Sequence, residues 1–296
     1  MMELTDLEVL VEAVRQGSLS AAGRRLGLTP VAASRRLATL EAELGVRLVH
    51  RTTRSLSLTP EGETFLPHAE TILDQAAEGR AAVAPGRAGA SGVLRITASG
   101  PFGRKVVTPM LARFLESHPN LRAELRLSDD FVDLAAAGVD VALRIGELRD
   151  NGLVARRLAD NPRGLFASPT YVERHGRPVR LADLTRHECL TTIGATHWTF
   201  ARGDRVVRQP VTGRFATDSF EALHQASLEG MGIVMLSEWN VRADVAAGDL
   251  MAVELTDAVV PDQGIWGVMP SSRLVPNKVR LFLDAFAFEL AKSRPD

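Results

Sequence analysis

The run Gly27-Leu28-Thr29-Pro30 constrains the fold more than any other part of the sequence, because it fits a tight turn that leads into a helix. Thr29 can accept a hydrogen bond as the residue before the helix, and Pro30 suits the first helical position, where an N–H would have no partner. Apolar residues then recur at the spacing of one buried stripe: Ala33, Leu37, Leu40 and Leu44. The pattern predicts a helix over about residues 30–44.

Two more helices are expected before this turn. Thr5 and Glu8 have the spacing of a capping box, and the apolar residues that follow repeat at helical spacing, which predicts a helix over about residues 5–15. Gly17 ends that helix, and Ser18 can cap a second one over about residues 19–26. Two short helices joined by a tight turn are typical of a module that places its second helix in the major groove of DNA.

The residues after the third helix predict a small hairpin. Residues 45–49 and 54–58 look like two short strands, and the connection between them carries His50 and Arg51. Such a wing can lie along the DNA backbone or in the minor groove. From Arg24 to Arg54 there are seven arginines and two glutamates, a local net charge of +5 in a chain whose net charge is −1. A basic patch of this kind supplies the salt-dependent part of DNA affinity.

Candidate DNA contacts lie at the start of the third helix and on the wing: Thr29, Pro30, Val31, Ser34, Arg35, Arg36, Arg51, Thr52, Thr53 and Arg54. The expected partner is a double-stranded operator with two-fold-related half-sites, because such modules commonly bind as dimers. The alternative is an ordinary helical bundle with a solvated arginine face.

The segments from Ser20 to Glu41 and from Gly45 to Gly62 resemble the DNA-reading core and the wing of the LysR-type transcriptional regulators. Ala33 departs slightly from the family pattern, in which a larger aliphatic residue is usual. The resemblance implies a cytoplasmic bacterial regulator that forms dimers or tetramers and responds to a small-molecule effector.

Residues 59–84 are expected to form a linker helix. A stripe suited to dimerisation runs along it: Phe65, Ala69, Ile72, Leu73 and Ala76. The resemblance implies that this stripe packs antiparallel on the same helix of a second subunit; the alternative is packing on the winged domain of the same chain. Pro67 leaves the start open, since a helix from residue 59 would contain it and one from residue 64 would hold it in the first turn. Residues 85–92 have the composition of a flexible hinge.

From residue 93 onward, short β-rich segments alternate with helical ones, which predicts an α/β domain with a mostly parallel sheet. Similar openings at residues 94–99 and 165–168 suggest two subdomains, 93–161 with 268–296, and 162–267. The whole fold is therefore expected to be an all-α winged helix-turn-helix over residues 1–58, the linker helix, and an effector domain over 93–296. The resemblance implies that this domain is periplasmic-binding-protein-like.

Ligands in such domains bind beyond the carboxyl ends of strands. The small residues after the first strand expose backbone N–H groups to an anion, and Phe102 offers an apolar wall. The candidate effector-binding residues are Ser99, Gly100, Pro101, Phe102, Ser128, Arg144, Thr192, Ile193, Thr217 and Asp218. The alternative for these positions is a helix cap or a surface ion pair. We expect a small, anionic effector.

The sequence contains no motif that indicates an enzyme, a metal site or a cofactor site. It lacks a phosphate-binding Gly-Lys-Ser/Thr run, a nucleophile elbow and a His-Glu-x-x-His pair. Cys189 is the only cysteine, and His187, Cys189 and His197 do not have the spacing of a zinc site. The acidic start and the lack of a long apolar run predict a cytoplasmic protein. The competing hypothesis is an α/β enzyme or carrier with a helical oligomerisation arm.

Overall fold

The computed structural model describes residues 2–51, 56–83, 90–128, 134, 137–146, 153–270 and 275–292. The contacts divide the chain into two units. One comprises Met1–Val93, His118–Arg122 and Pro276–Lys278, and the other comprises Leu94–Ser117, Ala123–Val275 and Val279–Asp296. Each unit is described separately.

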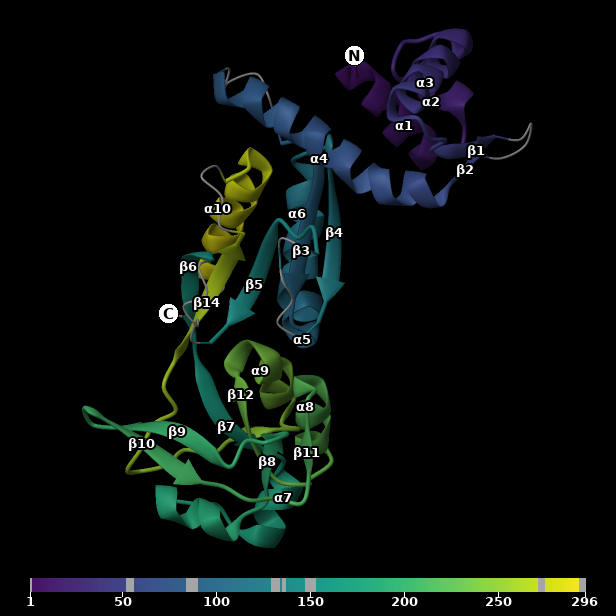
Figure 1. The fold of residues 1–296 in the computed structure, drawn as a ribbon. Helices are drawn as coiled ribbons and strands as arrows, with labels where there is room; N and C mark the ends of the chain where they lie inside the picture. The colour runs from purple at the N-terminus through teal and green to yellow at the C-terminus, as the bar shows by residue number, and fades with distance from the viewer. Residues whose placement is uncertain are drawn as a thin grey trace. The chain divides into compact units, whose positions relative to one another are not determined.

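The first unit begins with three helices: α1 (Leu4–Gln16), α2 (Leu19–Arg25) and α3 (Pro30–Leu44). They are followed by the antiparallel hairpin of β1 (Val49–Arg51) and β2 (Leu56–Leu58) (Figure 1). The expected α3 is confirmed, and the Thr29 hydroxyl accepts from the Ala32 N–H at 3.2 Å. The prediction that Thr5 and Glu8 form the capping box of the first helix is wrong. Helix α1 begins at Leu4, and the residue before it, Glu3, donates its N–H to Asp6 Oδ2 at 3.1 Å.

The linker helix α4 (Pro60–Val83) continues through Pro67. Thr59 explains the start: its hydroxyl accepts from the Gly62 N–H at 3.0 Å and donates to the Arg47 carbonyl at 2.7 Å. Pro60 then occupies a helical position that needs no N–H. Of the two expected starts, residue 59 and residue 64, the structure agrees with the earlier one, so Pro67 lies in the interior of the helix.

Much of the apolar stripe on α4 packs on the winged domain of the same chain. Ala69 is fully buried in a core with Leu7, Leu10 and Leu37, and Phe65 and Leu73 pack against that core. The structure thus supports the alternative of packing within one chain for these three dimerisation candidates. Ile72, which is 36% exposed, points away from this core.

The second unit contains most of two five-stranded sheets (Figure 1). The first sheet has the order β4 (Leu121–Leu127), β3 (Gly92–Ala98), β5 (Val141–Ile145), β14 (Gln263–Met269) and β6 (Val154–Asn161). The second has the order β11 (Ala216–Thr217), β8 (Cys189–Thr192), β12 (Ile233–Ser237), β7 (Arg163–Ala167) and β13 (Met251–Ala252).

The expectation of mostly parallel sheets is wrong, because both sheets are mixed. The pairs β3–β5, β8–β11 and β8–β12 are parallel, whereas β14 runs antiparallel to β5 and β6, and β7 runs antiparallel to β12 and β13. The reason is that the chain passes directly from β6 into β7 and returns through β14, without a crossover helix in either passage. Residues 263–267, expected in the second subdomain, therefore belong to the first sheet.

Helices and one further hairpin complete this part of the chain. They are α5 (Gly100–Phe102), a π-helical turn (Gly103–Val107), α6 (Thr108–Glu116), α7 (Pro169–His175), a 3-10 helix (Leu181–Arg186), α8 (Phe220–Leu228), α9 (Glu238–Ala247), α10 (Asn277–Lys292), and the hairpin of β9 (His197–Arg202) and β10 (Arg205–Pro210). The sequence did not indicate the hairpin, and most of the helix expected at 131–137 lies outside the described residues.

Two glycines of α4 make a matched test of this packing. A Cβ at Gly62 would lie 1.9 Å from the Leu48 carbonyl oxygen, whereas one at Gly79 would meet open space. Gly62→Ala should lower the free energy of unfolding by about 1–3 kcal/mol because backbone must move. Gly79→Ala should raise it by about 0.5–1 kcal/mol, since alanine loses less entropy in a helix. Urea denaturation at one protein concentration measures both, and equal effects would contradict the contact of α4 with the wing.

Candidate nucleic-acid surface and ligand cleft

The first turns of α3 present an accessible surface. Thr29, Pro30, Val31 and Arg35 are exposed, and the Val31 side chain is 78% exposed although it is apolar. The Arg35 guanidinium makes no ion pair with the part of the chain that the structure describes. A bidentate donor beside an apolar side chain on an open helix face is the combination that contacts guanine and the methyl group of thymine.

Arg36 has another role than the one expected from its place on α3. Its Nη1 contacts Glu3 Oε2 at 2.8 Å and Asp6 Oδ1 at 2.9 Å, and Asp6 is buried. Hydrogen bonds to Glu3 and Asp6 raise the pKa of Arg36. The guanidinium therefore joins α3 to the start of α1, and we remove Arg36 from the candidate DNA contacts.

The wing is attached to α3 through Glu41. The Glu41 Oε1 atom accepts from the N–H groups of Leu48 and Val49 at 2.9 and 3.2 Å. His50 is exposed on β1, and Arg51 pairs with Leu56 in the hairpin. The candidate contacts Thr52, Thr53 and Arg54 lie outside the described residues, as does the side chain of Arg51.

A cleft of about 270 Å³ lies between the two sheets of the second unit. Its walls come from the ends of β3, β5, β12 and β14, from the start of β7, and from α8 and α9. The lining residues are Ser99, Pro101, Leu143, Arg144, Ile145, Arg163, Phe220, Met235, Leu236, Ser237, Trp239, Asn240 and Gln263. The cavity is close to the size of small-ligand sites, and its walls are mostly apolar with a few polar groups.

Two polar groups of the cleft lack the partners that they need. The Arg163 guanidinium makes no hydrogen bond or ion pair within the described chain, and burial lowers its pKa. Asn240 is 3% exposed, and none of the residues that the structure describes donates a hydrogen bond to its Oδ1 atom. Buried polar groups are nearly always paired, so each of these marks a position where a ligand would be stabilised. Arg144 differs, because its Nη1 donates to the Ser128 carbonyl at 2.9 Å.

The base of the cleft is held by hydrogen bonds and aromatic packing. Asn161, at the end of β6, donates to Ser237 Oγ at 2.9 Å and accepts from Trp239 Nε1 at 2.7 Å. The Trp239 ring in turn lies 5.2 Å from the ring of Phe102, centroid to centroid. The start of α9 is therefore fixed relative to both sheets.

The structure brings together only some of the residues expected to bind an effector. Ser99, Pro101 and Arg144 line the cleft, and Gly100 lies between the first two. Phe102 is fully buried against Trp239 and Phe286, so it supports the site and does not form its wall.

The remaining effector candidates do not line the cleft. Ser128 contributes the carbonyl that accepts from Arg144, and its side chain lies elsewhere. Thr192, Ile193, Thr217 and Asp218 lie at the ends of β8 and β11, and these strands are on the far side of β12 from β7. The missed residues include Arg163 and Gln263, which lie at the two passages of the chain between the sheets. Because the sequence predicted mostly parallel sheets, it gave no reason to place these two residues in the cleft.

The three residues considered as a metal set do not form one. Within the described part of the chain, no group of three or more His, Cys, Asp or Glu side chains has a metal-binding arrangement. The Tyr171 hydroxyl lies 3.2 Å from His187 Nδ1, and burial raises the pKa of Cys189 to about 12.

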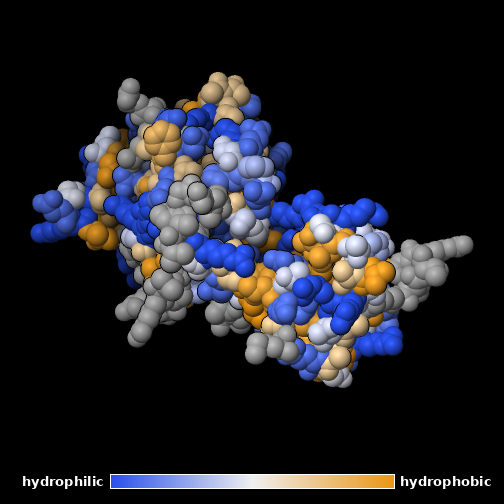
Figure 2. All heavy atoms as spheres, turned by 90° about the horizontal axis from the view of Figure 1, so that it is seen from above, coloured by the Kyte–Doolittle hydropathy of each residue, from blue (hydrophilic) through white to orange (hydrophobic). Residues whose placement is uncertain are grey.

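Along the described segments, no helix combines the length and the apolarity that crossing a bilayer requires. Hydrophilic and hydrophobic side chains are interspersed on the face shown in Figure 2.

Both parts of the chain match known domain families. A model of the LysR substrate binding domain matches residues 87–290, and a model of bacterial regulatory helix-turn-helix proteins of the lysR family matches residues 4–63. The HTH-type transcriptional regulator DmlR of Escherichia coli (strain K12) is 34% identical over 297 residues, which cover 99% of this chain and 96% of the relative.

Solved structures agree with these matches. The structure of CrgA, a LysR-type transcriptional regulator from Neisseria meningitidis, is 34% identical and superimposes with a TM-score of 0.62 over 97% of this chain and 98% of that chain. A mutant OxyR of Corynebacterium glutamicum is 20% identical with a TM-score of 0.74 over 99% of this chain and 94% of that chain, and it shares the fold. The chain belongs to the LysR family of bacterial transcriptional regulators, with an N-terminal DNA-binding helix-turn-helix and a C-terminal effector-binding domain.

Proposed function

We propose that this regulator reads its operator through the start of α3 and holds the DNA backbone through the wing. The exposed, unpaired Arg35 beside Val31 is the observation that supports base reading. The wing residues Arg51 to Arg54 would contact phosphates on either side of the groove. The operator would have two-fold-related half-sites, and the protein would act in the cytoplasm, where its DNA target lies.

We further propose that the operator-binding form is a dimer joined through α4. The resemblance to LysR-type regulators implies a dimer or tetramer, and Ile72 is the member of the apolar stripe that the winged core leaves exposed. Burial of an isoleucine contributes about 1.5–3 kcal/mol, so a second copy of α4 would be stabilised there.

For the cleft, we propose an effector that is a small carboxylate with a hydroxyl or another hydrogen-bond donor. Arg163 would pair with the carboxylate, and Asn240 Oδ1 would accept from the donor, so one ligand would satisfy both unpartnered groups. Charge-assisted hydrogen bonds are about twice as strong as neutral ones, which favours an anion over a neutral molecule.

The described lining of the cleft favours ligand binding over catalysis. The residues that are described as lining it include no carboxylate, histidine, cysteine, lysine or tyrosine. Ser99 and Ser237 also line the cleft, but a serine nucleophile needs an adjacent general base, and the groups that usually serve as one are among those missing from the described lining. This composition favours the effector hypothesis over the enzyme hypothesis, as does the description of the relatives as transcriptional regulators.

Two arginine substitutions separate base reading from phosphate binding. Arg35→Ala should weaken binding to an operator selected from random DNA by about 1–3 kcal/mol and relax the sequence preference at one position. Arg51→Ala should weaken operator and random DNA alike and reduce the slope of log affinity against log salt by about one. Arg35→Lys, which keeps the charge and loses the planar fork, serves as the control. Equal losses on both DNAs for Arg35→Ala would contradict base reading.

A charge on α4 tests the dimer. Ile72→Asp should dissociate the protein and abolish operator binding, because an ion resists the desolvation that an interface imposes. Val206→Asp is the matched control, since Val206 is 76% exposed on β10. Sedimentation velocity gives the mass of both variants, and circular dichroism shows whether each remains folded. An unchanged oligomer of Ile72→Asp would place the interface elsewhere.

Replacing Asn240 tests the effector class. Asn240→Leu removes the unsatisfied Oδ1 atom at nearly constant volume, so it should raise the melting temperature of the unliganded protein. It should also lower the affinity for the effector about tenfold or more. Calorimetry on the full chain would compare pairs such as lactate and propionate, which differ in one hydroxyl. Equal affinity of the two members for the parent protein, or unchanged affinity in Asn240→Leu, would contradict the proposal.

A further inference from the structure

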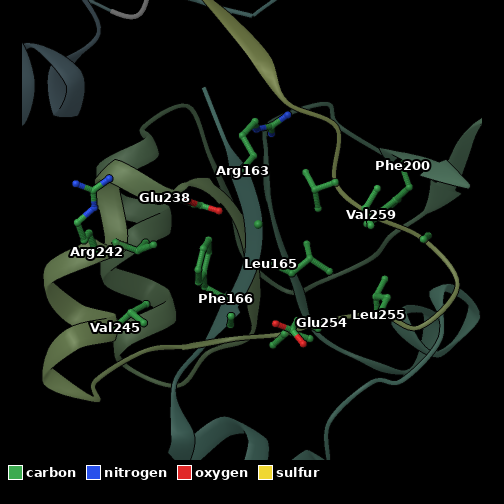
Figure 3. Close-up of a pocket in the computed structure, with 16 residues that line it drawn as sticks. Arg163, Leu165, Phe166, Phe200, Glu238, Arg242, Val245, Glu254, Leu255 and Val259 are labelled. Atoms are coloured by element: carbon green, nitrogen blue, oxygen red, sulfur yellow. The ribbon is translucent and has the colours of Figure 1, made fainter. Parts of the chain in front are cut away.

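A second cavity, of about 640 Å³, lies beside β7 in the effector domain. In Figure 3, Glu238, Arg242 and Val245 project from α9 on one side of this strand, and Leu255 and Val259 lie on the other. Among the described residues, Arg163 alone lines both this cavity and the cleft, and the other lining residues differ. The two cavities are therefore separate spaces with one guanidinium in common.

The cavity exists because β7 has an incomplete neighbour on one side. β13 pairs with Phe166 and Ala167 only, and after Val253 donates to the Leu165 carbonyl the chain leaves the strand. Leu165 and Phe166 are consecutive in a strand, so their side chains face opposite ways. Both line the cavity, which therefore surrounds the open edge of β7.

The inner wall of the cavity is apolar and well packed. Leu165, Phe200, Val241 and Val253 each expose 4% or less of their surface, so they form a packed layer beneath the accessible apolar lining. That lining includes Ala252, Leu255 and Val259. The cavity volume lies within the range of small-molecule sites, in which apolar walls are combined with a few polar groups.

The charges of the cavity differ in their exposure. Glu238, Arg242 and Glu254 are exposed at its rim, where water screens them. Arg163 is partly buried, and no carboxylate of the described chain, including the two rim glutamates, pairs with it. A desolvated cation without a partner is costly, so an anion that reaches it gains more than an anion at the rim.

We propose that this cavity is a second ligand site, for an apolar monocarboxylate whose carboxylate pairs with Arg163 and whose body lies on Leu255 and Val259, over the buried Leu165 and Phe200. The geometry selects one carboxylate, because a second negative charge would lie among the rim glutamates. It also selects an apolar body, because the inner wall offers few hydrogen bonds. The site would be distinct from the cleft in position and in ligand class.

Titration of the full-length protein with 3-phenylpropionate tests the proposal. Arg163→Met removes the charge at similar length, and Ala252→Trp fills the cavity from an exposed position on β13. Each substitution should lower the affinity for 3-phenylpropionate at least tenfold, as measured by calorimetry. Asn240→Leu alters a residue that lines only the cleft, so this variant should keep the affinity of the parent protein for 3-phenylpropionate. Melting temperatures identify any misfolded variant, and Val259→Trp, at a rim position that is 64% exposed, can replace Ala252→Trp.

Three outcomes would overturn the second site. They are no binding to the parent protein, unchanged binding in both Arg163→Met and the filled variant, and loss of binding in Asn240→Leu alone. Tighter binding of phenylalanine or 3-phenylpropylamine than of 3-phenylpropionate would overturn the ligand class. A crystal soaked in 3-(4-bromophenyl)propionate locates the bromine by anomalous scattering: a position beside Phe200 supports the proposal, and one beside Trp239 contradicts it. The effector proposal for the cleft is tested separately by lactate binding to Asn240→Leu, because Asn240 lines the cleft and not the second cavity.

Discussion

The effector domain depends on one buried asparagine at the point where the chain leaves the first sheet. Asn161 is fully buried, and both polar atoms of its side chain are used, one by Ser237 and one by Trp239. A buried amide stabilises a fold only when its hydrogen bonds are complete, so these two bonds fix the start of α9 against the end of β6. The positions of Asn240 and of the cleft follow from this connection.

In the DNA-binding domain, carboxylates hold the reading elements in place. Asp6 and Glu3 pair with Arg36 and fix the exposed face of α3 with respect to α1. Glu41 accepts two backbone N–H groups at the start of the wing. These acidic residues lower the net charge of the module, but they hold the elements that present Arg35 and the wing. A basic patch provides affinity only when it is presented in a fixed arrangement.

The sequence predicted the elements whose signals are local. Thr29, Pro30 and the stripe from Ala33 to Leu44 specified α3 residue by residue, because caps and periodicity act within a few turns. The division of the effector domain into two α/β parts was recognisable from the alternation of strands and helices.

The long-range features could not be predicted in this way. Whether Arg35 or Arg36 is free depends on Glu3 and Asp6, some thirty residues away. The direction of β14 depends on how the chain returns from the second sheet, and that return places Gln263 in the cleft and leaves Thr192 outside it. The stripe on α4 likewise had two possible partners, and only the packed structure shows Ala69 inside the winged core.

The position of Arg163 between two cavities has a consequence for signalling. Two anions that approached Arg163 from the two cavities would share the five N–H donors of one guanidinium, and their like charges would repel each other. Such antagonism is reciprocal, since each ligand must weaken the other by the same factor. If both cavities bind acids, the occupancy of each would therefore depend on the concentrations of both acids. The regulator would then respond to two different acids through the side chain of Arg163.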